Sequence, residues 1–281
     1  TFGIKTFNTI INKTQKNSFI PFKFIQTLKK ETGLNYKTLY SKSLKTITPK
    51  VNTTINSLEA INVRKKNNYE SYYYPIETED GGVLFLKQGL GSYQHFGIID
   101  TLGKSKKIFT PGLINNYGRI SYAENNLVWL EFDKDPRWNK RVYSIVKVFD
   151  SKRKKIISKS KKTFYASVDI SQNGDSLVAL NNNLDGSQSL VFLNIKNCNP
   201  TKEIKLKNGV YSNLRFTNEN EIIGIKTKNG IKTVFIYSIK KNEFKEIFNT
   251  NKNIGAPTKY GSLIAFSSSE NEKDEILIYN L

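Results

Sequence analysis

The sequence predicts a mainly β protein, a β-propeller of about five four-stranded blades behind a short N-terminal α-helical segment. The first observation is that the hydrophobic period changes from helical to alternating near residue 60. The second is that several strand-like elements then recur in the same order, five times over. The composition agrees, since 38% of the residues are hydrophobic and 12% aromatic, largely Tyr and Phe, which suits strands packed on strands.

The first part of the chain, residues 1–60, has a helical pattern. Apolar residues recur at helical spacing in three stretches, 7–11, 22–28 and 39–47. Gly33 should end the second helix, because glycine readily takes the left-handed conformation found at helix C-termini. The polar stretch 50–68 predicts a linker, so the domain boundary is placed between the helical segment 1–60 and the blades 61–281.

Two apolar strands recur in every predicted blade. Copies of the first lie roughly 40 to 50 residues apart, the period of four-stranded blades, at 82–85, 126–129, 176–179, 221–224 and 262–265. The second strand of this kind follows each copy, at 96–100, 144–150, 190–194, 234–238 and 276–280. A sandwich or barrel also contains many short strands, but it does not predict the same elements in the same order five times.

Two further strands complete a blade. Charged strands that should form the outer edges, where lysine discourages aggregation, occur at 106–109, 154–157 and 244–248. Inner strands are expected at 72–76, 120–122, 166–169, 212–215 and 256–258.

Blades 1 and 2 carry a resemblance to a known family. The segments 127–129, 131–133, 135–138 and 141–146, with 72–76 and 109–112 before them, resemble TolB-like (WD40-like, PD40) propellers of exported, Bacteroidetes-type bacterial proteins. At 171–175 this chain lacks the Pro and Asp of that family's Ser-Pro-Asp-Gly-Lys turn but keeps Gly174. The resemblance implies a periplasmic or cell-envelope protein whose partner is an envelope protein, a peptide or a glycan.

The N-terminal segment has a resemblance of its own. The segments 21–24, 28–30, 32–33 and 39–40 are similar to the last helices of a gluzincin-type, peptidase-MA-like metallopeptidase domain. That family binds zinc with a His-Glu-x-x-His helix and a downstream acid, which would lie upstream of Thr1. The resemblance implies that 1–60 is the tail of such a domain. Zinc is then possible in the parent protein, while no cofactor is expected in this segment.

The beginning and end of the chain suggest that it is a piece of a longer protein. It contains no methionine and starts in mid-pattern at Thr1, and its last residues form a predicted strand. Since a stable propeller joins its last blade to its first, we expect the isolated segment to be an open arc with exposed strand edges.

The residue inventory argues against catalysis in this segment. His95 is the only histidine, so a two-histidine zinc site cannot form, and any His-dependent triad would have to use this one residue. Cys198, the only cysteine, lies in a predicted turn without a base, and there is no glycine-rich phosphate loop. No apolar run approaches the ~18 residues of a membrane helix. We therefore predict neither catalytic nor metal-binding residues here.

The net charge of +20 invites a nucleic-acid interpretation, which the residue types argue against. Only about six of the 44 basic residues are Arg, the side chain favoured for phosphate and guanine contacts. Lysine is spread over nearly every segment, as expected from a biased overall composition. An anionic lipid or polysaccharide surface is a somewhat better candidate partner than nucleic acid.

The hairpin 131–141 of the second blade is the predicted contact site for a ligand or partner. Long loops on a rigid scaffold often carry function, and Arg and Trp are enriched where binding energy concentrates. The candidate residues are Asp133, Asp135, Arg137, Trp138 and Arg141. The alternative is structural, because Asp-Pro is ordinary turn chemistry, and the lack of further nearby acids argues against calcium.

The predicted function is a non-catalytic propeller module that binds a partner in the cell envelope. The alternative is a part that gates or presents substrate for a zinc metallopeptidase whose His-Glu-x-x-His domain lies upstream. A third possibility, attachment to an anionic polymer, predicts that binding weakens as salt rises.

Overall fold

The computed structural model describes residues 2–47, 61, 68–114, 120–138, 140–270 and 273–281. It divides into two compact units, Thr1–Ala60 and Ile61–Leu281. The predicted linker 50–68 lies almost wholly outside the described residues. Among the described helices, none is long and apolar enough to cross a membrane.

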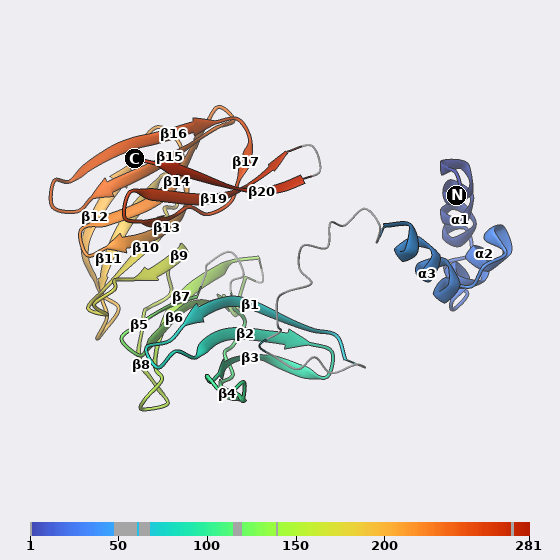
Figure 1. Ribbon diagram of the computed structural model, residues 1–281, viewed down its shortest axis with the longest axis horizontal. Coiled ribbons are helices and arrows are strands. Elements are labelled where there is room, and N and C mark those ends of the chain that lie inside the picture. The colour runs from blue at the N-terminus through green and yellow to red at the C-terminus, as the bar shows by residue number, and fades with distance from the viewer. Residues whose placement is uncertain (1, 48–60, 62–67, 115–119, 139, 271–272) are drawn as a thin grey trace. The chain divides into compact units, whose positions relative to one another are not determined.

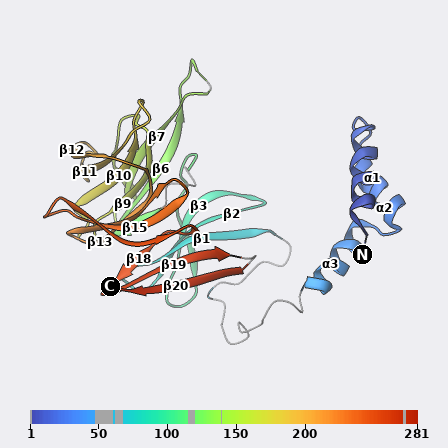
Figure 2. The same ribbon diagram turned by 90° about the horizontal axis from the view of Figure 1, so that it is seen from above.

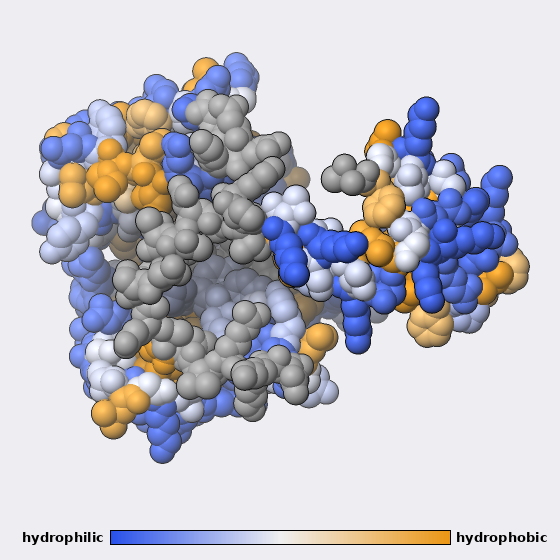
Figure 3. Space-filling model, turned by 45° about the vertical axis from the view of Figure 1, so that its right-hand side comes forward, coloured by the Kyte–Doolittle hydropathy of each residue, from blue (hydrophilic) through white to orange (hydrophobic). Residues whose placement is uncertain are grey.

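The N-terminal unit contains the three predicted helices, α1 (Ile4–Gln15), α2 (Lys23–Thr32) and α3 (Tyr36–Ile47). As expected, α2 ends at Gly33, whose φ of 69° is left-handed. An ion pair of 2.8 Å between Lys13 and Glu31 joins α1 to α2, and Ile10 and Leu28 are buried. Much of the apolar surface stays exposed, and Figure 3 shows hydrophobic areas set among hydrophilic ones on this unit.

The second unit is a five-bladed β-propeller of antiparallel sheets, which confirms the predicted fold class. Figures 1 and 2 show the sheets following one another in chain order, from the first blade to the fifth. Blades 1 and 2 contain β1 (Glu70–Glu77), β2 (Val83–Gly89), β3 (Ser92–Ile99), β4 (Ser105–Phe109), β5 (Ser121–Ala123), β6 (Asn126–Lys134), β7 (Val142–Asp150) and β8 (Lys155–Lys159).

Blades 3 and 4 repeat the same order of strands from the inner to the outer edge. They contain β9 (Tyr165–Ile170), β10 (Ser176–Asn182), β11 (Gln188–Asn194), β12 (Pro200–Leu206), β13 (Val210–Asn218), β14 (Glu221–Lys228), β15 (Ile231–Ser238) and β16 (Glu243–Thr250).

The fifth blade departs from this pattern. Its strands are β17 (Asn253–Ile254), β18 (Thr258–Tyr260), β19 (Leu263–Glu270) and β20 (Lys273–Asn280). Both short strands, β17 and β18, pair with β19, so they share the inner position. Pro257, which has no N–H to donate to a ladder, lies between them. Among the described strands, β20 pairs only with β19.

Four apolar clusters lie at the four joints between successive blades. The joint of blades 1 and 2 is aromatic, with the Trp129 ring edge-on to Phe96 at 5.0 Å and tilted to Phe109 at 5.6 Å. Cys198 is buried at the joint of blades 2 and 3, where its Sγ lies 3.1 Å from the Ser158 hydroxyl. Burial raises the pKa of this thiol. The propeller is therefore held together mainly by packing between blades.

Candidate functional site

Five inner-strand residues occupy equivalent positions, one in each blade. Each is paired with the corresponding residue of the blade's second strand, namely Leu84, Val128, Val178, Ile223 and Ala265. The five inner residues, which we call the axial ring, are Ile76, Ser121, Asp169, Arg215 and Thr258. Their side chains all line one pocket of about 220 Å³. The repeat thus brings five residues from across the chain to a single site.

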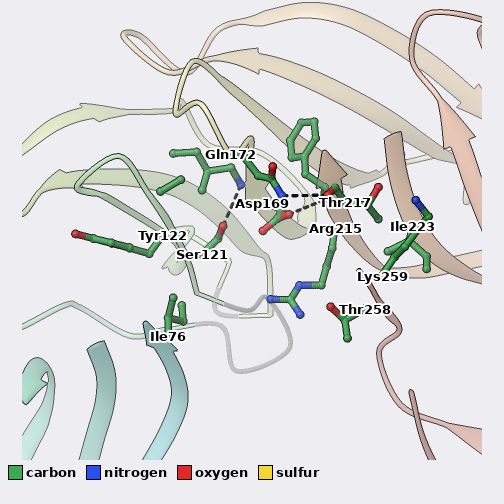
Figure 4. A pocket seen from close by; sticks show the side chains of 13 residues that line it. Ile76, Ser121, Tyr122, Asp169, Gln172, Arg215, Thr217, Ile223, Thr258 and Lys259 are labelled. Carbon is green, nitrogen blue, oxygen red and sulfur yellow. Dashed lines mark hydrogen bonds between the residues drawn. The ribbon is translucent and has the colours of Figure 1, made fainter. Parts of the chain in front are cut away.

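Asp169 joins blade 3 to blade 4. Its Oδ2 accepts a hydrogen bond of 2.6 Å from the Phe216 N–H (Figure 4). Ser121 does the same one blade earlier, because its Oγ accepts from the Ile170 N–H at 3.0 Å. Burial raises the pKa of the Asp169 carboxyl, although Ser121, Arg215 and the Phe216 N–H oppose the rise. Asp169 is thus a buried structural link, with little freedom to contact a ligand.

Arg215 holds the same ring position in blade 4, but a guanidinium has no acceptor and cannot make this link. In Figure 4 its side chain extends into the pocket, with the guanidinium between Ile76 and Thr258. Among the described residues the guanidinium makes neither a hydrogen bond nor an ion pair within 4.0 Å. Asp169 acts on it only through the longer-range charge interaction. Arg215 therefore brings an unmatched, partly buried positive charge to the pocket.

Lys259, which follows the ring residue Thr258 of blade 5 and also lines the pocket, is paired already. Its Nζ lies 3.0 Å from Glu221 Oε2 at the start of β14. Burial pushes the pKa of Glu221 upward, but the hydrogen bond and the charge of Lys259 outweigh it and hold that pKa below its usual value. This ion pair fixes Lys259 at the pocket wall and leaves Arg215 as the cation free to receive a ligand.

The pocket can bind an anionic group, and its chemistry does not suggest a reaction. A guanidinium offers planar, paired donors that match a carboxylate. In the part of the chain that the structure describes, no group of three or more His, Cys, Asp and Glu side chains could hold a metal ion. His95 lies in β3 and its Nδ1 is 2.9 Å from the Tyr93 carbonyl oxygen. It does not line the pocket.

The predicted contact residues lie on a different part of the propeller. The hairpin 131–141 begins within β6, and the connection to β7 spans only 135–141. Asp133 pairs with Lys162 at 3.0 Å. Asp135 is buried, and its Oδ1 accepts from the Arg137 N–H at 2.9 Å, as in an ordinary Asx turn.

Of the remaining hairpin residues, Arg141 lies over the Tyr143 ring at 5.2 Å, and Trp138 is 64% exposed. Four of the five predicted residues thus lie around Tyr143. Its hydroxyl donates to Asp135 Oδ2 at 3.4 Å, and the Arg137 Nε is 3.9 Å from Asp135 Oδ1. Lys162, the partner of Asp133, also lies over the Tyr143 ring. Asp135 has a structural contact, whereas Arg141 and Trp138 remain accessible.

Sequence reasoning missed the axial ring, although the signal was present. The predicted inner strands already contained Ile76, Ser121, Asp169 and Arg215. Aligning these strands by the turns and apolar strands that follow would have placed the four residues, and Thr258 with them, at one position of the repeat. The sequence signal was that this position holds Ser121 and Asp169 in blades 2 and 3 but Arg215 in blade 4.

Comparison with known proteins places the fold. No protein-family model matches the chain, and no curated protein matches it. Among solved structures, TolB from Acinetobacter baumannii matches with a TM-score of 0.59 and 12% identity over 75% of this chain and 52% of that one. Putative TolB from Agrobacterium tumefaciens matches with a TM-score of 0.55 and 13% identity, over 75% and 78% of the two chains.

Peptidases contain a similar propeller. Acylaminoacyl peptidase from Pyrococcus horikoshii matches with a TM-score of 0.54 and 16% identity, over 74% of this chain and 37% of that one. The chain thus spans about half the length of the Acinetobacter TolB and a smaller part of the peptidase. At these identities the likeness establishes a TolB-like propeller fold.

Proposed function

We propose that this chain is a non-catalytic interaction module that binds an acidic segment of a partner in the axial pocket. The observation that carries the proposal is Arg215, a partly buried guanidinium without a hydrogen bond or an ion pair among the described residues. A buried cation without a counter-ion is costly. An incoming carboxylate would relieve that cost and form charge-assisted hydrogen bonds.

The surroundings of Arg215 support a binding role. Asp169, the nearest carboxyl of the ring, accepts from the Phe216 N–H, and Lys259 is paired with Glu221. Neither is arranged as a general acid or base beside a nucleophile. The partner class that fits is a protein or peptide of the cell envelope, or a glycan that bears acidic groups. A periplasmic or envelope location and an exported, Bacteroidetes-type source belong to the same proposal.

A second candidate function follows from the peptidase propellers that share the fold. In this version the module gates or presents substrate for a zinc metallopeptidase whose catalytic domain lies upstream, and 1–60 is the tail of that domain. The likeness to a peptidase propeller supports it only at the level of the fold. Finding a His-Glu-x-x-His helix upstream in the parent gene would favour this candidate, and a different upstream domain would remove it.

The binding proposal is tested with two pools of random octapeptides, one containing Asp and Glu and the other containing Asn and Gln in their place. We expect the chain to retain the acidic pool preferentially. Arg215→Gln should weaken retention about tenfold or more, the usual effect of losing a charge-assisted hydrogen bond.

The matched control is Arg153→Gln, which removes an exposed Arg in the turn between β7 and β8 that pairs with Asp150 at 3.5 Å. It has the same effect on net charge but lies outside the pocket. Equal losses in both variants would mean that the acidic peptides respond to overall charge, and the proposal would fail.

A further inference from the structure

A second pocket, of about 380 Å³, lies between blades 2 and 3. Its apolar lining includes Phe132, Val142, Tyr143, Phe164 and Ala166. Phe164 and Ala166 lie at the beginning of the inner strand β9, whereas Asp169 and Ile170 at its end line the axial pocket. The two pockets are thus separate and can be tested independently.

The second pocket exists because the sheet of blade 2 extends beyond the cover of blade 3. Leu130 and Val146 form a cross-strand pair that is fully buried at the joint of the two blades. Phe132 and Ser144 are the next pair on the same face; Ser144 is buried, whereas Phe132 is only half-buried and lines the pocket. Thr163 forms a backbone bridge with Ser144, and the next residue, Phe164, forms one side of the pocket.

The rim of the second pocket is basic. Arg141 and Lys162 both lie over the Tyr143 ring, at 5.2 and 5.3 Å. Lys162 is paired with Asp133, whereas the guanidinium of Arg141 has no ion pair among the described residues. The segments 132–142 and 161–166, which frame the pocket, contain six cations and two carboxylates: Lys134, Arg137, Lys140, Arg141, Lys161 and Lys162 against Asp133 and Asp135.

We infer that the second pocket binds an acidic peptide segment that inserts one large apolar side chain between blades 2 and 3. The apolar lining suits the inserted side chain, and the excess of positive charge on the rim complements acidic residues on either side of it. Trp138, exposed in the same hairpin, is a further candidate contact for the bound segment.

Other ligand classes fit the second pocket less well. Arg141 and Lys162 lie over the Tyr143 ring and would compete with a sugar or a base for stacking on it. Two polar groups of the lining are also engaged, because the Ser144 hydroxyl lies 3.2 Å from that of Thr163 and Asn182 Oδ1 accepts from Gln188 at 2.8 Å. A glycan, which needs many free hydrogen-bonding groups, would find few here.

The test uses a synthetic decapeptide of Glu and Gly with one central Phe, titrated into the chain by calorimetry. Two matched peptides carry Ser in place of Phe, or Gln in place of every Glu. We expect saturable binding of the first peptide, at least tenfold weaker binding of the other two, and a decrease as salt is raised.

Two variants address the pocket itself. Val142→Asp places a negative charge at a residue that is 37% exposed and should weaken binding at least tenfold. Arg141→Gln should weaken it about threefold to tenfold, while Arg153→Gln should leave it unchanged. In Arg215→Gln, which impairs the axial pocket, saturable binding at the second pocket should remain. The altered side chains are exposed or line a pocket, so we expect these variants to fold. Circular dichroism checks the folding of each variant.

Several results would overturn the inference. If the Ser-containing peptide bound as well as the Phe-containing one, the site would be a basic surface without an apolar anchor. Equal weakening by Arg141→Gln and Arg153→Gln would assign the binding to net charge. Binding abolished by Arg215→Gln would move the peptide to the axial pocket, which would support the proposed function and contradict a second site.

Discussion

Blades 3 and 5 contain closely similar third strands that end in different environments. The sequence of β11 at 190–194 and that of β20 at 276–280 are both apolar runs that end in Asn. Leu190 is 1% exposed, whereas Ile276 and Ile278 are 77% and 68% exposed. The reason is that Leu190 packs against blade 4 in the cluster at the joint of blades 3 and 4, whereas Ile276 and Ile278 belong to none of the described apolar clusters. A repeat pattern predicts a strand, but burial depends on its neighbours.

The comparison predicts that replacing a buried side chain lowers stability more than replacing an exposed one. The largest loss of stability is expected for Trp129 in blade 2. Its ring is fully buried, and its Nε1 donates to Glu131 Oε1 at 2.9 Å. Trp129→Ala should lower the free energy of unfolding by about 3–5 kcal/mol, because it leaves a large cavity and a buried carboxylate that lacks one donor. Urea titration measures the change.

Trp138→Ala is the matched control for this prediction. Trp138 is 64% exposed, so its removal should change stability by no more than about 0.5 kcal/mol. If Trp129→Ala cost as little as Trp138→Ala, the joint of blades 1 and 2 would contribute little to stability.

The next effect compares the two third strands directly. Leu193 in β11 is 1% exposed, so Leu193→Ala should cost about 2–4 kcal/mol. Ile278→Ala in β20 should cost under about 0.5 kcal/mol, because the side chain is already in solvent. A cost for Ile278→Ala that approaches that of Leu193→Ala would indicate that something covers β20 in solution, and the contrast between the blades would fail.

The smallest loss of stability is expected from the hydrogen bond between Asp169 and the Phe216 N–H, which joins blades 3 and 4. Blade 4 has Arg215 at the position of Asp169, and a guanidinium cannot accept such a hydrogen bond from blade 5. Asp169→Ala should cost about 1–3 kcal/mol, since the Phe216 N–H loses its acceptor. Asp169→Asn retains an acceptor and should be close to neutral or stabilising at pH 7.

The effect of pH on stability tests whether the pKa of the Asp169 carboxyl is raised in the folded chain. Because burial raises the pKa of this carboxyl in the folded state, the folded chain binds a proton more readily than the unfolded chain. The stability of the wild type relative to Asp169→Asn should therefore rise as the pH falls through the raised pKa, and level off below the unfolded value. Paired urea titrations at pH 7 and pH 4.5 measure it. A relative stability that falls with pH would mean that the pKa is lowered.

Much of the fold could be predicted from the sequence because each element is local. Alternating apolar residues and turn residues mark the strands, and Gly33 marks the end of α2. The divided inner strand of the fifth blade was not predicted, although Pro257 lay within the expected strand 256–258. A proline removes one ladder donor, and whether the strand then splits depends on the pairing partner β19.

The site was harder to predict than the fold. The hairpin 131–141 attracted attention because Trp138 and Arg141 are unusual residue types in a loop, and that prediction remains a proposal. The axial ring is made of residues from five blades, and its meaning comes from their convergence on one pocket. Arg137 lies 3.9 Å from Asp135, whereas Arg215 has no ion pair among the described residues. This difference depends on three-dimensional contacts that no local sequence pattern contains.

The buried thiol of Cys198 has a practical consequence for studying the dynamics of the propeller. It is the only cysteine, and it lies in blade 3 against Ser158 of blade 2. A maleimide or disulfide reagent can reach it only when these two blades part or the turn around it opens. The rate of modification under native conditions, compared across reagent concentrations, therefore reports how often the joint or the turn opens, without any engineered label.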